Sequence, residues 1–175
     1  MEQHKDGLGL FQVKPEEYGP KYGEQLMEQY KLYVEMADRV SERRSTANTF
    51  FLTANTLLVS IFGAIVGKDA ALSSDSINIW FLLFALSGLA FSLAWFFIVK
   101  SYRQLNSSKF KIIEEMEKNL PLAPYRAEWI ALGKGENPKL YRSLTDIEKF
   151  APFTFSAIYI ILLSINIYKL IPKPS

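Results

Sequence analysis

The chain has 175 residues, of which 49% are apolar and 22% charged, with a formal net charge of +2. The absence of cysteine excludes disulfides and thiolate chemistry, and a single histidine excludes a multi-histidine metal site within one chain. The small net charge does not favour nucleic acid as a partner. We therefore expect no catalytic residue, no metal and no cofactor.

Three stretches carry no Asp, Glu, Lys or Arg: residues 45–67, 76–99 and 150–168. A helix needs about 20 apolar residues to cross the hydrocarbon core of a membrane. The spacing of the charges therefore predicts an all-α membrane protein with three transmembrane helices.

Residues 1–20 hold Gly and Pro without a period and predict an irregular N-terminal segment. From residue 21 the pattern changes, because apolar residues recur at alternating spacings of four and three, typical of a coiled-coil seam. The seam consists of Leu26, Tyr30, Tyr33, Ala37 and Val40. With no Pro or Gly between Glu24 and Phe62, this helix is predicted to run unbroken into the first span, about residues 46–66.

The second span, about residues 77–99, also continues without a helix breaker, as far as Leu120, and Pro121 and Pro124 end it. The linker between the two spans is short. The sequence thus predicts a long antiparallel hairpin over residues 21–120, whose extramembrane halves pack as a coiled-coil-like pair in the cytoplasm.

Residues 121–144 are rich in Pro, Gly and aromatic residues and predict a cytoplasmic loop with one short helix near residues 126–132. The third transmembrane helix is predicted over residues 145–170. Thr145 and Glu148 form a capping-box pattern at its start. Pro152 either kinks this helix or places its true start near Ala151.

The basic residues predict the orientation. Seven Lys and Arg precede the first span and ten lie between the second and third, whereas the hairpin loop has only Lys68 and the tail only Lys169 and Lys173. The positive-inside rule then places the N-terminus in the cytoplasm and the C-terminus in the periplasm or outside.

One side of the first span is polar, and small or hydroxylated residues in a membrane helix favour close helix packing or line water. We prefer packing and keep a pore as an alternative. The possible pore-lining residues are Asn48, Thr49, Asn55, Thr56 and Ser60. The predicted oligomer interface comprises the five seam residues with the small residues Gly88 and Ser92 of span two. Predicted lipid-headgroup contacts are Arg43, Arg44, Lys100, Arg103 and Trp129.

The acidic run Glu114, Glu115 and Glu117 admits two interpretations, paired carboxylates for catalysis or a solvated helix face. We favour the solvated face because Lys111 and Lys118 lie within one turn.

The segments beginning at Tyr30, Ala47, Ser101, Pro124 and Tyr141 give the sequence a resemblance to the RipA family of bacterial membrane proteins. In this sequence they read YKLYVEMADRVSERR, ANTFFL, SYRQLNSSKF, PYRAEW and YRSLT. The resemblance implies a small inner-membrane homo-oligomer, an octamer, needed for intracellular proliferation. The architecture also looks like the two-span membrane effector modules of bacterial defence systems.

The function predicted from these features is a ring-like, scaffold or channel-like homo-oligomer in the bacterial inner membrane. The resemblance to the RipA family implies that this assembly supports bacterial adaptation or intracellular proliferation. The alternatives are a membrane-disrupting or ion-conducting defence effector and an adaptor that binds a cytoplasmic protein through residues 100–149. A membrane-anchored enzyme or transporter subunit is disfavoured, because the sequence offers no nucleophile–base pair and no charge within the spans.

Overall fold

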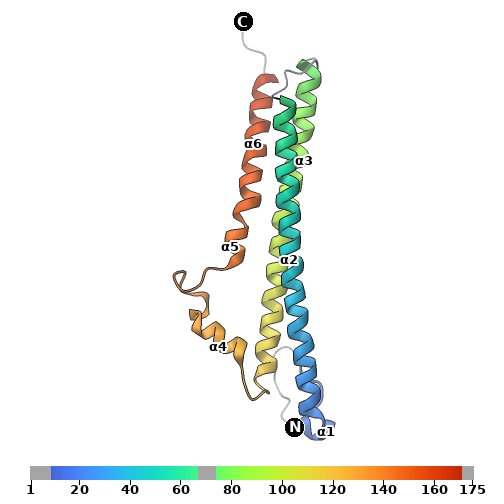
Figure 1. Ribbon diagram of the computed structural model, residues 1–175, viewed down its shortest axis with the longest axis vertical. Coiled ribbons are helices and arrows are strands. Elements are labelled where there is room, and N and C mark those ends of the chain that lie inside the picture. Colours follow the sequence, from blue (N-terminus) through green and yellow to red (C-terminus); the bar gives the residue numbers. More distant parts are fainter. Residues whose placement is uncertain (1–8, 67–73, 171–175) are drawn as a thin grey trace. The chain divides into compact units, whose positions relative to one another are not determined.

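The computed structural model describes residues 9–66 and 74–170, and this part of the chain contains helices and no strand. Figure 1 shows the order of the elements along the chain. They are α1 (Pro15–Tyr18), α2 (Tyr22–Val66), α3 (Ser74–Glu117), α4 (Pro124–Ala131), the 3₁₀ turn η1 (Gly133–Gly135), α5 (Leu144–Glu148) and α6 (Phe150–Leu170). The predicted all-α class is confirmed.

Three helical stretches are long and apolar enough to cross a membrane: Tyr22–Ala64, Ile79–Glu117 and Phe150–Tyr168. In each, the charge-free residues fall where the sequence predicts a span. Most of the predicted hairpin linker, residues 68–76, lies outside the described residues. So do residues 1–8 of the predicted N-terminal segment and the side chain of Thr145 in the predicted capping box.

The chain divides into two compact units. Within the described residues, the first consists of residues 9–43 and 102–143 and the second of residues 44–101 and 144–170. Each unit therefore contains a part of α2 and a part of α3.

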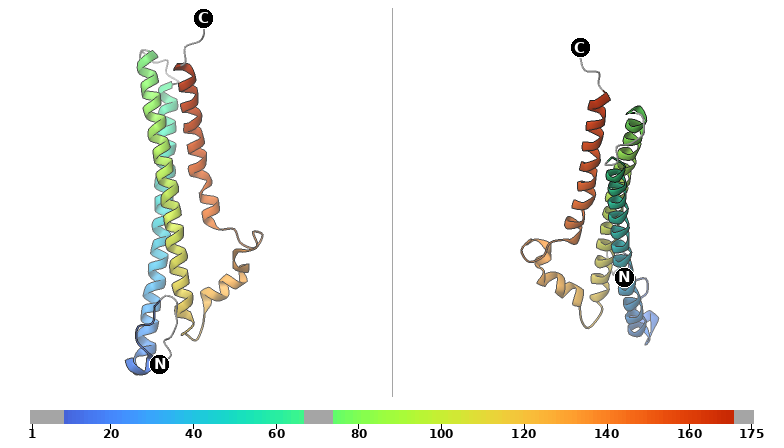
Figure 2. Two further views of the ribbon diagram at one scale, coloured as in Figure 1. Left: turned by 180° about the vertical axis from the view of Figure 1, so that it is seen from behind. Right: turned by 45° about the horizontal axis from the view of Figure 1, so that its top comes forward.

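In the second unit α2, α3 and α6 lie side by side in both views of Figure 2. The core contains Phe51, Trp95 and Val99, with Phe155 of α6 packed against it. The Phe51 and Trp95 rings are stacked with centroids 5.9 Å apart. Large aromatic side chains fill the space between helices and fix their contacts.

In the first unit the parts of α2 and α3 that belong to it pack through Leu26, Ala37, Ile113 and Met116, all buried. Ile113 is fully buried. Asn106 of α3 donates a hydrogen bond to Ser41 of α2 at 3.4 Å. The two helices are thus in contact here, while the coiled-coil register stays a prediction.

The third span begins with a break in the helix. α5 ends at Glu148 and α6 begins at Phe150, which makes Pro152 the third residue of α6. Proline is tolerated in the first turn because those N–H groups have no partner within the helix. The start of α6 thus agrees with the alternative in which the helix begins near Ala151, rather than with a kink at Pro152.

Candidate functional site

A buried polar cluster joins the three helices of the second unit. Asn55 of α2 is fully buried, and its side-chain oxygen accepts hydrogen bonds from Ser92 at 3.2 Å and from Tyr159 at 3.1 Å. Its side-chain nitrogen donates to the Phe51 carbonyl at 2.9 Å. From the sequence, Asn55 was a possible pore-lining residue, with helix packing preferred, and Ser92 was a predicted contact with another copy. The structure brings both together inside one chain, as helix packing requires.

Gly88 of α3 lies against Tyr159 of α6. A Cβ atom built on Gly88 would come within 2.2 Å of the Tyr159 ring, far closer than atoms can approach. Gly88 thus permits close packing of α3 on α6, the role that small residues serve in membrane helices. The sequence recognised the small residue but assigned it to a contact between copies.

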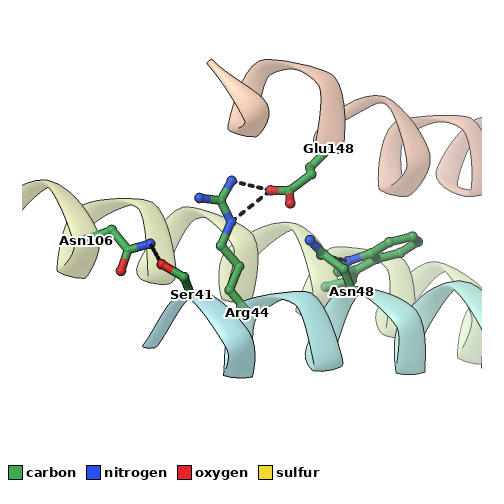
Figure 3. Close-up of polar contacts among 6 residues, drawn as sticks. Ser41, Arg44, Asn48, Asn106 and Glu148 are labelled. Carbon is green, nitrogen blue, oxygen red and sulfur yellow. Dashed lines mark hydrogen bonds and ion pairs between the residues drawn. The ribbon is translucent and has the colours of Figure 1, made fainter. Parts of the chain in front are cut away.

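Asn48, another predicted pore residue, also points into the second unit. Its side-chain oxygen accepts a 2.8 Å hydrogen bond from the indole nitrogen of Trp95 on α3, and Figure 3 shows Asn48 turned toward α3. A buried indole N–H needs an acceptor. Asn48 supplies that acceptor to Trp95 within the same chain.

The other predicted pore residues point away from the second unit. Thr49, Thr56 and Ser60 are exposed on α2, as is Thr53 between them. Thr56 donates to the Leu52 carbonyl at 2.8 Å, and Ser60 donates to the Thr56 carbonyl at 2.8 Å. We call Thr49, Thr53, Thr56 and Ser60 the hydroxyl stripe. It is the part of the predicted polar face that one chain leaves uncovered.

Arg44 was predicted to contact lipid headgroups, but its guanidinium group bonds to Glu148 of α5. Its Nε donates to the Glu148 carboxylate at 2.9 Å, and a second nitrogen contacts the same oxygen (Figure 3). The two side chains are 11% and 16% exposed. This ion pair ties α2 to the start of the third span.

The remaining predicted headgroup residues lie at the surface of the chain. Arg43, Lys100, Arg103 and Trp129 are all exposed. The Trp129 ring packs edge-on against Tyr141, with centroids 6.2 Å apart. Their contact with lipid stays a prediction.

The predicted seam of α2 meets α3 of the same chain. Leu26 and Ala37 are buried, Val40 is half-buried and Tyr33 lies 4.5 Å from the ammonium group of Lys109. Burial also raises the pKa of Tyr33. These residues thus have partners within one chain, and their contact with another copy stays a prediction.

Glu117, at the last residue of α3, is buried rather than solvated as the acidic run predicted. Its carboxylate accepts hydrogen bonds from the Tyr30 hydroxyl and from the backbone N–H groups of Tyr125 and Arg126, all at 3.0 Å. Those two amides open α4, which receives no cap from its own Ala123. A carboxylate at a helix N-terminus is stabilised by the free amides and the helix dipole.

Two tyrosines around Glu117, both outside the charge-free spans, hold their protons tightly. Burial raises the pKa of Tyr30 to about 12, and the hydrogen bond to Glu117 and its negative charge add to the effect. The pKa of Tyr125 is also raised, first by burial and then by the charge of Asp38. One signal in the sequence could have indicated this arrangement: Pro124 opens a helix that has no capping residue of its own.

Within residues 9–66 and 74–170, no group of three or more His, Asp or Glu side chains is placed to hold a metal ion. The expectation that the protein is not an enzyme stays a prediction.

The comparison with known proteins agrees with a membrane assembly. Residues 27–168 match the model of the family described as "Octameric membrane protein family (8xMP)". No curated protein and no solved structure matches the chain.

Proposed function

We propose a function from one premise: the chain belongs to the octameric membrane protein family. Eight copies would form a ring in the bacterial inner membrane, and the ring would act as a scaffold rather than as an enzyme. The N-terminus would lie in the cytoplasm, as the distribution of Lys and Arg favours. The role in adaptation or intracellular proliferation follows from the resemblance to the RipA family.

The hydroxyl stripe of α2 supports this proposal most directly. Its four side chains are exposed in a single chain, although they lie in a charge-free segment long enough to cross a membrane. Short hydroxylated side chains let two helices approach closely and hydrogen-bond across the contact. In the proposed ring the stripe faces other copies rather than lipid.

The experiment is native mass spectrometry of the full chain in mild detergent. We expect eight copies for the natural sequence and smaller species for Thr56→Phe, because a bulky ring would keep neighbouring helices apart. Ile61→Phe is the matched control, since Ile61 is exposed on another face of α2. An unchanged octamer with Thr56→Phe would remove the stripe from the contact, and a monomeric natural chain would remove the ring.

A channel is the second candidate function, and the exposure of the same hydroxyl groups favours it. If the stripe lines a lumen, the natural protein should conduct ions in planar bilayers. Thr56→Lys should then reduce cation current, because a fixed positive charge in the pore repels cations. A silent octamer would exclude the channel and leave the scaffold.

The defence-effector and adaptor alternatives make different predictions. An effector that disrupts membranes should release dye from vesicles, and an adaptor should retain a cytoplasmic protein only when residues 100–149 are present. Neither result is expected from a closed scaffold.

A further inference from the structure

The first unit exposes apolar side chains on a part of α2 that is too highly charged to face lipid tails. α2 carries eight charged side chains between residues 22 and 43, too many for this part to enter the hydrocarbon region. Yet Leu32 is 58% exposed and Met36 44% exposed, one helical turn apart. We call Leu32 and Met36 the α2 patch.

A second exposed apolar surface lies in residues 122–142, which we call the α4 arm. Leu122, Ile130 and Leu140 are 79%, 55% and 60% exposed, respectively. The arm is a folded element, because Trp129 packs on Tyr141 and its ring lies against Gly135. Its apolar side chains are therefore displayed on a defined surface rather than on a loose loop.

The arm is fixed to the rest of the first unit at its N-terminal end. Glu117 holds the first amides of α4, and the Phe110 and Tyr125 rings lie with their centroids 5.8 Å apart. Figure 1 and both views of Figure 2 show α4 leaving the pair of helices on the side of α3 away from α2.

The α2 patch lies on a different side of α2 from the arm. On α2, the side toward the arm is marked by Tyr30, whose hydroxyl donates to the Glu117 carboxylate that also holds the first amides of α4. At 3.6 residues per turn, the direction midway between Leu32 and Met36 lies about 140° from that of Tyr30. Arm and patch are therefore displayed on different sides of one chain.

The segments that display the two surfaces carry opposite net charge. Residues 22–43 of α2 hold five acidic and three basic side chains, a net charge of −2. Residues 122–142 hold four basic and two acidic side chains, a net charge of +2. Opposite net charge on the two segments favours their association.

From these observations we infer that the α4 arm of one copy binds the α2 patch of the next copy, head to tail. A contact between two different surfaces produces a ring when the rotation from each copy to the next leads back to the first copy. The inference rests on the proposed octamer and adds the surfaces that join its members outside the membrane. The partner is a second copy of this chain.

Cysteine cross-linking tests the contact directly, because the natural sequence contains no cysteine. Met36→Cys and Ile130→Cys are combined in one full-length chain, expressed in membranes and treated with a short thiol-reactive cross-linker. We expect a ladder of covalent species reaching eight chains. The two single variants expressed together should give dimers, and either one alone should give none.

Lys111→Cys combined with Ile130→Cys is the control, because Lys111 is exposed on a face of α3 other than that of Ile113 and Met116. If native mass spectrometry shows an octamer but Met36→Cys with Ile130→Cys gives no ladder, this contact is overturned and the proposed function is left intact. Three further results would also overturn the contact. They are cross-linking of a single variant to itself, protection of Ile130→Cys from the reagent by anionic lipid alone, and cross-linking of Ile130→Cys only to a different protein. A monomer would overturn both proposals.

Discussion

Asn55 on α2 and Tyr159 on α6 are joined by a buried hydrogen bond of 3.1 Å. With the bond from Ser92, it makes the side-chain oxygen of Asn55 a link between α2 and both other spans. Interhelical hydrogen bonds in membranes contribute about 0.6 kcal/mol on average, because the separated helices find other partners in part. The cluster therefore specifies how the three helices meet more than it adds stability.

Removing this cluster should weaken the packing of the spans in two steps. Tyr159→Phe loses one hydrogen bond and should lower stability by about 0.6 kcal/mol. Asn55→Leu leaves both Ser92 and Tyr159 without their acceptor and should cost about 2 kcal/mol. Thermal unfolding in detergent measures both. Tyr168→Phe, at an exposed position of α6, is the control and should change little.

A methyl group should be far more damaging at Gly88 than at Gly63. At Gly88 a Cβ atom would meet the Tyr159 ring at 2.2 Å, so Gly88→Ala forces α3 and α6 apart. At Gly63 no atom of the described residues, outside its neighbours and the backbone of its own helix, lies within 4 Å of the added atom. We expect Gly88→Ala to lower the unfolding temperature by several degrees and Gly63→Ala to leave it unchanged or raise it, because alanine favours the helix. Equal effects would contradict the close packing of α3 on α6.

The sequence predicted the spans because the lack of charge over about 20 residues is a local property that one helix displays by itself. It did not predict which side of α2 meets its neighbours. Asn48 and Asn55 adjoin Thr49 and Thr56 in sequence, yet they point inward while the threonines point outward. The difference depends on Trp95 and Tyr159, and the spacing of polar residues along α2 carries no information about either partner.

Glu117 shows the same limit outside the spans. Glutamate beside Lys118 in a charged run is typical of a solvated face, and Glu115 does pair with Lys118 at 2.6 Å. Glu117 is buried because the chain turns back after Pro121 and presents the amides of α4 to it. Only the tertiary fold supplies those amides and the Tyr30 hydroxyl.

The ion pair between Arg44 and Glu148 should contribute to the attachment of the third span. Both side chains are mostly buried, so removing one charge leaves the other without its partner in a poorly solvated place. We expect Glu148→Gln to cost about 2 kcal/mol of stability, below the range for fully buried pairs. Glu35→Gln breaks an exposed pair with Arg39 and should cost less than about 0.5 kcal/mol. Thermal unfolding of both variants in the same detergent compares them.

Glu117→Gln should loosen α4 and release the Tyr30 proton more easily. Without the negative charge, the pKa of Tyr30 should fall from about 12 toward its ordinary value of 10.0. This pKa is measured from the phenolate absorbance as the pH is raised, for the natural chain and for Glu117→Gln. The absorbance of the same protein carrying Tyr30→Phe is subtracted from each, so that only the signal of Tyr30 remains. Hydrogen exchange at the amides of Tyr125 and Arg126 should also become faster, because both donate to the Glu117 carboxylate. Glu115→Gln, which removes only the contact with Lys118, should change neither observable.

The same interaction sets the direction of the dependence of stability on pH. The folded chain binds the Tyr30 proton more tightly than the unfolded chain, so the contribution of Tyr30 is complete below about pH 10. It is lost as the pH rises toward the folded pKa of about 12. Between these two values the unfolding temperature of the natural chain should fall more steeply with pH than that of Tyr30→Phe, which has no proton to lose. Parallel curves for the two proteins would mean that the Tyr30 hydroxyl is equally acidic in the folded and unfolded chain, against the buried contact with Glu117.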